Sequence, residues 1–479
     1  MSRSARRDFH SPPPAPDCLF LYTYLSMSYA AAIDQLNALA PELYSTPGRP
    51  RRKFSLAEIG ILLDRLGNPH RTFPSILIAG TNGKGSTAAT LASILDVSGL
   101  RTGLYTSPHL ERANERIRIG CDEISDTDFA RHFFAVRSVS DQLVAVGTLA
   151  QAPSFFETLT AMAFLHFAEQ SIDMAVLEVG MGGRLDATNI VDPLLSIVTD
   201  ISLDHTEWLG PTVSAIAREK AGILRANGTL VTLPQHPEAN QALGEIAVDL
   251  NVRGVSATAY MPSLGTASNQ PYPLEVLGAE IAVASPLSGA HQQRNIALAI
   301  AAAVELAQTR HLPITASTIE QGIRATRWPA RFERIAGRGV QWILDVAHNP
   351  AGAWALRAGL RDLLNATGSQ SNVLVFSCLR DKPLTEMAQI LFPLFDRVIF
   401  APIHSPRATP VADLLHAAEV TGTPAESASS VEEALALTAR TLQSSDRESL
   451  TPARRIAVVS GSVYLVGEAR ALLTAGRSQ

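Results

Sequence analysis

The sequence predicts an α/β protein with two mostly parallel sheets, and three observations support this prediction. Short apolar runs recur along the chain, and several end at a glycine or a polar residue. Stretches with helical character separate them, as expected for strands buried on both faces and joined by crossover helices. The chain has 479 residues, enough for two or three domains, and its 46% hydrophobic content excludes disorder over the full length.

Residues 1–26 are expected to be a loose tail or sequence upstream of the true start at Met27. Three arginines precede an uncharged run over 19–33, which resembles a signal peptide. Prolines interrupt the approach to this run, and tyrosines and serines make it polar. The apolar spacing at its end predicts an amphipathic helix instead.

The first sheet is predicted from apolar runs over 75–79, 174–179 and 195–199, with a helix over 88–95 after the first run. Residues 250–290 are rich in Ser, Gly, Pro and Val and predict short strands that flank this sheet.

A second series of apolar runs follows residue 330, separated by alanine-rich helical stretches. The predicted strands cover 342–346, 373–376, 397–400 and 456–459. The Trp-Pro pair near residue 328 is the expected seam, which divides the chain into lobes over 27–327 and 328–479.

A glycine-rich loop is the strongest single signal, because it follows a predicted strand and opens a predicted helix. Its residues are Gly80, Thr81, Asn82, Gly83, Lys84, Gly85 and Ser86. Glycines let several N–H groups face one anion, and the helix N-terminus favours phosphate. The spacing differs from G-x-x-x-x-G-K-[ST], since Gly85 separates Lys84 from Ser86. The alternative is a flexible turn, but the strand–loop–helix context favours a phosphate-binding loop.

Polar residues follow two of the predicted strands. Glu178 lies at the end of one apolar run, and Asp204 and His205 follow the next. Carboxyl ends of parallel strands meet at one sheet edge, and an acid there commonly holds Mg²⁺ beside bound phosphates. The alternatives are a partnered structural carboxylate and a structural histidine.

Four further motifs are ambiguous by themselves. Lys220 precedes Gly222 and reads as an exposed lysine near a helix end that the glycine caps. Residues 107–110 read as a turn, and residues 114–117 as the exposed start of a polar strand. In the second lobe, residues 345–349 offer an acid, an imidazole and an amide together at a strand end.

Ten motifs, spread from about Ser55 to Glu468, occur in an order that chance does not explain. They are Gly80–Ser86, Thr106–Leu110, Asn114–Ile117, Phe155–Glu157, Glu178–Asn189, Asp204–His205, Glu219–Ile223, Gly289–Gln292, Arg331–Glu333 and Ala347–Pro350. With them the sequence resembles the folylpolyglutamate synthase/dihydrofolate synthase family of the Mur ligase superfamily. The resemblance implies a P-loop NTPase-like domain with a small flanking β region and a smaller, Rossmann-like C-terminal domain.

The resemblance also implies a reaction. ATP phosphorylates a substrate carboxylate, and the amine of L-glutamate attacks the acyl phosphate to give an amide, ADP and phosphate. The acceptor is dihydropteroate or the terminal γ-carboxylate of a folate. Lys84, loop N–H groups and Mg²⁺ would offset the repulsion between the γ-phosphate and the acceptor carboxylate.

The family's site residues carry over by position. Ser107 and Glu178 match ligands of one Mg²⁺, His205 matches a ligand of a second, and Lys220 matches a lysine that is carbamylated and serves Mg²⁺ as a carboxylate would. Asn295, Arg331 and Asp345 match nucleotide contacts. The residues that match the catalytic group are Lys84, Lys220, Asp345 and His348.

The substrate side also carries over from the resemblance. His348 and Ser462 match positions near the acyl phosphate and the incoming glutamate, and His348 is a candidate general base. The residues that match pterin contacts are Ser154, Phe155, Phe156, Glu157, Leu185, Asp186 and Ala187.

Two positions depart from the family pattern. Ala330 and Val346 stand where the family commonly has glycine. Both replacements fall at backbone turns and put the local geometry in question, while Arg331, Asp345 and His348 remain.

The composition restricts the partners. A net charge of −5 argues against a generic nucleic-acid binder, and three widely spaced cysteines indicate a reducing, cytoplasmic setting. No segment has the length of a membrane span, and we expect a monomer acting on small molecules. The alternatives are a Mur-type ligase for UDP-linked substrates, a non-ligase P-loop NTPase, and an inactive binding module.

Overall fold

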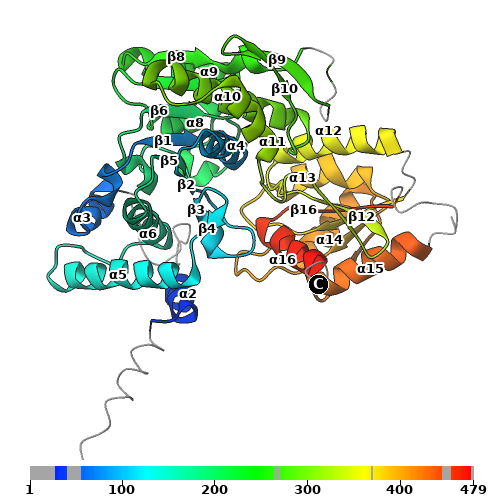
Figure 1. The fold of residues 1–479 in the computed structure, drawn as a ribbon. Helices are drawn as coiled ribbons and strands as arrows, with labels where there is room; N and C mark the ends of the chain where they lie inside the picture. The colour runs from blue at the N-terminus through cyan, green and yellow to red at the C-terminus, as the bar shows by residue number, and fades with distance from the viewer. Residues whose placement is uncertain are drawn as a thin grey trace, which may run out of the picture.

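The computed structural model describes residues 27–39, 55–263, 266, 270–367, 371–444 and 455–475. The tail predicted over 1–26 lies outside these residues. The described chain forms two α/β lobes that lie side by side, the first coloured blue to green and the second yellow to red in Figure 1.

The first lobe contains an eight-stranded sheet in the order β4-β3-β2-β5-β1-β6-β7-β8. The six strands from β2 to β8 in this order are parallel, and β3 and β4 run antiparallel at one edge. The strands are β1 Ser75–Ala79, β2 Thr102–Tyr105, β3 Ile117–Ile119, β4 Asp122–Glu123, β5 Met174–Glu178, β6 Leu195–Val198, β7 Thr229–Thr232 and β8 Arg253–Ser256.

Helices cover both faces of this sheet because alternate residues of each strand point to opposite sides. Leu77 of β1 packs in one core with α2, α3, α5, α6, α8 and α9, whereas Ile76 and Ile78 pack in the other with α4, α10 and α11. The helices are α2 Tyr29–Ala38, α3 Leu56–Arg65, α4 Lys84–Val97, α5 Asp126–Ala145, α6 Phe155–Glu169, α7 Thr206–Leu209, α8 Val213–Ala221, α9 Pro237–Asp249, α10 Ala290–Arg310 and α11 Ala316–Ala325.

The second lobe contains a six-stranded sheet in the order β11-β12-β16-β13-β14-β15, parallel except for β11. The strands are β11 Glu333–Gly337, β12 Val340–Leu344, β13 Ser371–Phe376, β14 Arg397–Phe400, β15 Ala425–Ser427 and β16 Arg455–Ser460. One core contains α12 Pro350–Thr367, α13 Leu384–Leu391 and α14 Val411–Thr421, and the other contains α15 Val431–Ser444 and α16 Val463–Thr474.

The predicted fold class is confirmed, with local corrections. Within residues 250–290, β8 extends the large sheet, whereas β9 Tyr272–Val276 and β10 Ala279–Val283 form a separate hairpin. Residues 113–116 form a 3₁₀ turn rather than an exposed strand start, and Asn114 and Arg116 are buried. The Asn114 side chain accepts from the Tyr29 hydroxyl and donates to the carbonyl of Ile124, which explains its burial.

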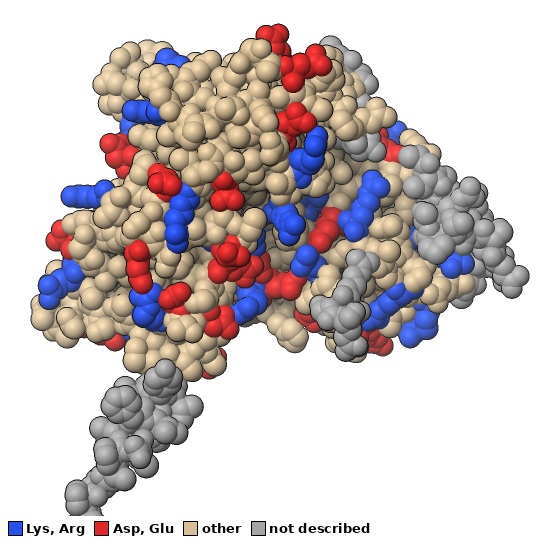
Figure 2. Space-filling view, viewed as in Figure 1, with Lys and Arg blue, Asp and Glu red and all other residues tan. Residues whose placement is uncertain are grey.

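The linker between α11 and β11 contains the predicted seam, and the boundary at 327/328 stays a prediction. The lobes also touch elsewhere: the Arg470 guanidinium lies 2.7 Å from Glu111 Oε1. Figure 2 shows basic and acidic side chains interspersed over this face of the molecule, in keeping with the small net charge. Among the described residues, no helix has the length and apolar character needed to cross a bilayer.

Candidate active site

A cleft of about 550 Å³ lies between the lobes, at the carboxyl ends of strands from both sheets. Every residue predicted to bind nucleotide or metal lines this cleft, although the chain contributes them from widely separated segments. These residues are Gly80–Ser86, Ser107, Glu178, His205, Lys220, Asn295, Arg331, Asp345 and His348.

The phosphate loop connects β1 to α4, and glycine is required at two of its positions. Gly80 (φ +154°) lies so close to Thr199 that a Cβ would sit 1.8 Å from the hydroxyl oxygen. Gly83 is left-handed (φ +89°), and a Cβ there would lie 2.1 Å from Asn295 Oδ1. These two glycines therefore let the loop backbone pack closely against Thr199 and Asn295, next to the N–H groups of the first turn of α4 that have no partner within the helix.

Two lysine ammonium groups converge on one carbonyl at the base of this loop. Lys84 Nζ donates to the carbonyl oxygens of Gly80 and Thr81, at 3.1 and 3.2 Å. Lys220 Nζ donates to the same Gly80 oxygen at 2.7 Å. Lys220 is buried, so its interpretation as an exposed lysine was wrong; burial, with the Lys84 charge, lowers its pKa to about 7.

Glu178 ends β5 beside β1, where its carboxylate is buried and faces the phosphate loop. Burial raises its pKa, against the opposing charge of Lys84 and the backbone N–H of Ser107. That N–H donates to Glu178 Oε2 at 3.1 Å. A buried carboxylate beside a phosphate loop is suited to a bound cation.

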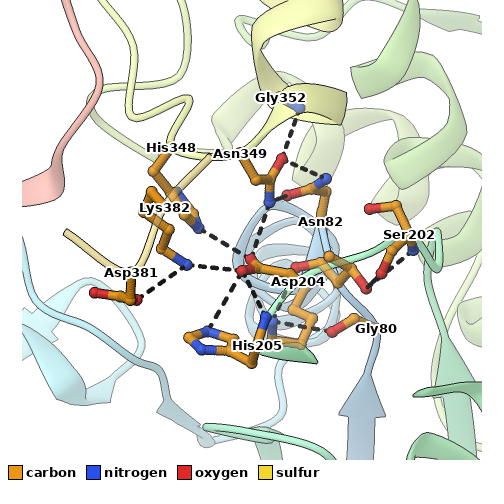
Figure 3. A network of polar contacts seen from close by, with 12 residues as sticks. Gly80, Asn82, Ser202, Asp204, His205, His348, Asn349, Gly352, Asp381 and Lys382 are labelled. Carbon is orange, nitrogen blue, oxygen red and sulfur yellow. Dashed lines mark hydrogen bonds and ion pairs between the residues drawn. The ribbon is translucent and has the colours of Figure 1, made fainter. Parts of the chain in front are cut away.

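Asp204 is the centre of a polar network that joins the lobes (Figure 3). Its carboxylate accepts from Lys382 Nζ at 2.7 Å and from Asn349 Nδ2 at 3.0 Å, both from the second lobe. Asn349 also exchanges hydrogen bonds with Asn82 of the phosphate loop, at 3.0 and 3.3 Å. Despite burial, the neighbouring His348 imidazole and the Lys382 ammonium hold the pKa of Asp204 well below its usual range.

Two histidines flank this carboxylate. His205 Nε2 lies 3.9 Å from Asp204 Oδ1, and burial with the nearby Lys382 charge lowers the His205 pKa to about 4. His348 Nε2 lies 3.7 Å from Asp204 Oδ2. Since the Val346 carbonyl can only accept, the 2.8 Å contact requires His348 Nδ1 to carry a proton, which leaves the Nε2 lone pair free in the neutral ring.

Asp345 shapes the turn that presents Arg331 to the cleft. Its carboxylate accepts the N–H groups of Phe332 and Ala347, both at 2.9 Å. Burial raises the pKa of Asp345 and lowers that of Arg331. The charge of each group acts against the shift of the other. Ala330, which replaces the family's glycine, is left-handed at φ +57°, so this departure does fall at a position that favours glycine.

A smaller cavity of about 120 Å³ contains most of the predicted pterin contacts. It shares Met181, Gly182 and Leu209 with the main cleft, so the two spaces adjoin. The predicted residues that line it are Phe156, Glu157, Leu185, Asp186 and Ala187.

The other predicted substrate residues have local structural contacts. Ser154 caps α6 by accepting the Glu157 N–H at 3.2 Å, and the Phe155 ring lies under the Arg116 guanidinium. Ser462 is buried and caps α16, and the next residue, Val463, lines the cleft.

Sequence reasoning gave no site role to Lys382 or His291. Lys382 binds the cleft residue Asp204 from a loop after β13 with no motif around it, so no local signal marks it. His291, by contrast, was part of a matched motif, and burial lowers its pKa where it lines the cleft at the start of α10.

The fold and this cleft define a class of protein. Residues 78–303 match the model of the Mur ligase middle domain, and residues 330–462 match the model of the Mur ligase glutamate ligase domain. The protein is an ATP-dependent ligase of the Mur type.

Comparison with individual proteins narrows the class. The folylpolyglutamate synthase of Lacticaseibacillus casei is 34% identical over 431 residues, covering 87% of this chain and 94% of the relative. Mycobacterium tuberculosis folylpolyglutamate synthase complexed with ADP has a TM-score of 0.82 at 33% identity, covering 93% and 99%. Escherichia coli FolC in complex with DHPP and ADP has a TM-score of 0.77 at 29% identity, covering 94% and 99%. The chain belongs to the folylpolyglutamate synthase/dihydrofolate synthase family.

Proposed function

We propose that the protein uses ATP to join L-glutamate to dihydropteroate, to the γ-carboxylate of a reduced folate, or to both. One observation carries the proposal: a phosphate loop from the first lobe and Arg331, Asp345 and His348 from the second line a single cleft. A nucleotide in this cleft would contact both lobes, so its γ-phosphate would lie where an acceptor and glutamate can meet. The named relatives support this acceptor class.

The phosphate loop binds the triphosphate in this proposal. The backbone N–H groups of the α4 first turn donate to phosphate oxygens, and Lys84 leaves its carbonyl partners to neutralise them. Asn295 and Arg331 flank the nucleotide, and Asp345 holds the turn that carries Arg331.

The cleft residues fit Mg²⁺ only together with substrate oxygens. Among the described residues, no group of three or more His, Cys, Asp or Glu side chains is arranged to hold a metal. Mg²⁺ commonly keeps phosphate and water ligands beside one or two carboxylates, and Glu178 is a buried carboxylate that lines the cleft. Ser107 and Glu178 would hold one ion and His205 a second; bound Mg²⁺ neutralises charge on the transferring phosphoryl group.

Lys220 is proposed to carry a carbamate. Carbamylation joins CO₂ to a neutral amine with loss of a proton, and a pKa of about 7 leaves the buried amine about half neutral at pH 7. The modification exchanges a cation crowded against Lys84 for an anion with two acceptor oxygens. It therefore relieves the repulsion between the two lysines and supplies an oxygen ligand.

The acceptor carboxylate attacks the γ-phosphorus of ATP, the bond from that phosphorus to the β-phosphate oxygen breaks, and ADP leaves while the acyl phosphate forms. The pterin would occupy the adjoining small cavity, where Phe156 offers a ring and Asp186 is buried.

The glutamate amine then attacks the acyl carbon, phosphate leaves, and a proton is lost from nitrogen. His348 is the proposed base because its Nδ1–H is held by the Val346 carbonyl, and because it lines the cleft with its Nε2 3.7 Å from Asp204 Oδ2. Asp204 would stabilise the imidazolium that forms.

A phosphate-release assay tests the proposal, with ATP and glutamate held constant while the acceptor varies. Dihydropteroate, tetrahydrofolate and a reduced-folate monoglutamate form the test set, and a UDP-linked peptide tests the Mur-type alternative. We expect release that requires both glutamate and a pteroate or folate. Release that needs neither, or needs the UDP substrate, would refute the proposal.

A further inference from the structure

Trp328, in the linker between α11 and β11, contacts the phosphate loop directly. A Cβ built on Gly85 would lie 2.8 Å from Cζ2 of Trp328 and 3.1 Å from its Cε2 and Nε1. Gly85 is the second residue of α4, in the turn whose N–H groups face the cleft. The indole edge is thus in van der Waals contact with the segment that shapes the phosphate site.

A second contact fixes the orientation of the indole. The Arg118 guanidinium carbon lies over its ring, 5.7 Å from the centroid. Arg118 is itself held by the Glu115 carbonyl at 3.1 Å and by Glu123 Oε1 at 3.3 Å. A cation over an aromatic face is an attractive, directional contact, so β3 restrains the ring from a different side than Gly85 does.

The helix before the linker, α11, is anchored to α4, and the linker enters the cleft after Trp328. Ser93 of α4 donates to the Gly322 carbonyl at 2.7 Å, and a Cβ on Gly322 would lie 2.4 Å from the Cα of Ile94. Three residues beyond Trp328, Arg331 lines the cleft. The end of α11 and the linker that follows it therefore each contact α4, and the linker then carries Arg331 into the cleft.

Hydrogen bonding does not account for the indole at this position. Trp328 Nε1 is buried and has no hydrogen-bond partner among the described residues. A buried N–H without a partner is unfavourable, so the contribution of the side chain lies in its shape and contacts.

We propose that Trp328 is a positioning residue for the nucleotide, which holds the phosphate loop in its binding shape and couples it to the linker of the second lobe. This inference rests on the proposed binding of ATP at that loop. It assigns Trp328 to nucleotide affinity and not to glutamate binding.

The test compares ADP binding by calorimetry for the wild type, Trp328→Ala and Trp328→Phe. Trp354→Ala is the matched control, because that indole is 58% exposed on α12 and likewise lies against an arginine. We expect Trp328→Ala to weaken ADP binding about tenfold, or about 1.4 kcal/mol. Trp328→Phe, which keeps part of the ring, should lose less, and the control should bind as the wild type does.

Steady-state kinetics separate positioning from general destabilisation. The KM for ATP should rise in Trp328→Ala while the KM for glutamate stays within about twofold, because Trp328 contacts the phosphate loop. Wild-type ADP affinity in both Trp328 variants would overturn the inference, as would an equal rise in both KM values. If Trp328→Ala does not fold, Trp328→Phe carries the same test. Failure of the wild type to bind ADP would instead refute the proposed function.

Discussion

The sharpest prediction concerns Lys220, which carries the proposed carbamate. The ordinary lysine pKa of 10.5 would leave about one amine in three thousand neutral at pH 7, whereas the lowered pKa of about 7 leaves about half. The lowered pKa therefore raises the neutral fraction of the Lys220 amine at pH 7 about a thousandfold. We expect Lys220→Ala to lose about ten- to a hundredfold in kcat, as removal of metal-supporting groups does.

Added short carboxylic acids, such as formate or acetate, should restore part of this activity by supplying oxygens in the vacated space. The neutral fraction of the amine increases with pH, so wild-type activity in bicarbonate should rise through pH 7 and then level off. Arg218→Gln is the control, because Arg218 lies on the same helix and pairs with Glu245 on the surface. Full activity of Lys220→Ala, or activity unaffected by CO₂ removal, would refute the reasoning.

Two further predictions concern the junction of the lobes. The side chains of the Lys382–Asp204 ion pair are only 6% and 9% exposed, so Lys382→Ala should lower the free energy of unfolding by about 3 kcal/mol. The double variant with Asp204→Ala should lose less than the sum of the two single losses, because both single variants remove the same contact. Denaturant unfolding measures these three losses, and strict additivity would contradict a direct interaction between the two side chains. The variant Ala330→Gly should relieve about 1–2 kcal/mol of left-handed backbone strain. It also loses a methyl group and gives the unfolded chain more freedom, and these two effects destabilise the fold by a similar amount. The free energy of unfolding, measured by thermal unfolding, should therefore change by less than about 1 kcal/mol, and a decrease above about 2 kcal/mol would contradict this prediction.

The strands were predictable because burial on both faces leaves a continuous apolar run. The run over 75–79 coincides with β1, and the run over 397–400 coincides with β14. The edge strands β11 and β15 were not predicted, and neither were β2 and β7, which have a neighbour on each side. Both β2 and β7 have four residues and include threonine, so their apolar runs are too short to stand out in the sequence.

Site residues could be predicted where a motif reflects a constraint on the local backbone, such as a position with no room for a Cβ. Gly80 and Gly83 are such positions, since contacts with Thr199 and Asn295 exclude any Cβ. The burial of Lys220 was not predictable from its neighbours, because it arises from packing against the carbonyl of Gly80, far away in sequence.

The residue contacts between the lobes likewise could not be predicted from the sequence. Lys382 meets Asp204 across 178 positions of chain, and no residue near either one signals the other. Only the folded arrangement of two sheets brings them to 2.7 Å. The two-lobed cleft is therefore a property of tertiary structure, although its single motifs can be read locally.

The fate of the acceptor's carboxylate oxygen tests the central claim most directly. Dihydropteroate or a folate labelled with ¹⁸O in its reacting carboxylate would be converted with ATP and glutamate, and the released phosphate examined by mass spectrometry. The account predicts that one labelled oxygen passes to phosphate for each amide formed, because the acyl C–O bond breaks after phosphorylation. Phosphate without label, alongside amide product, would contradict the acyl-phosphate route.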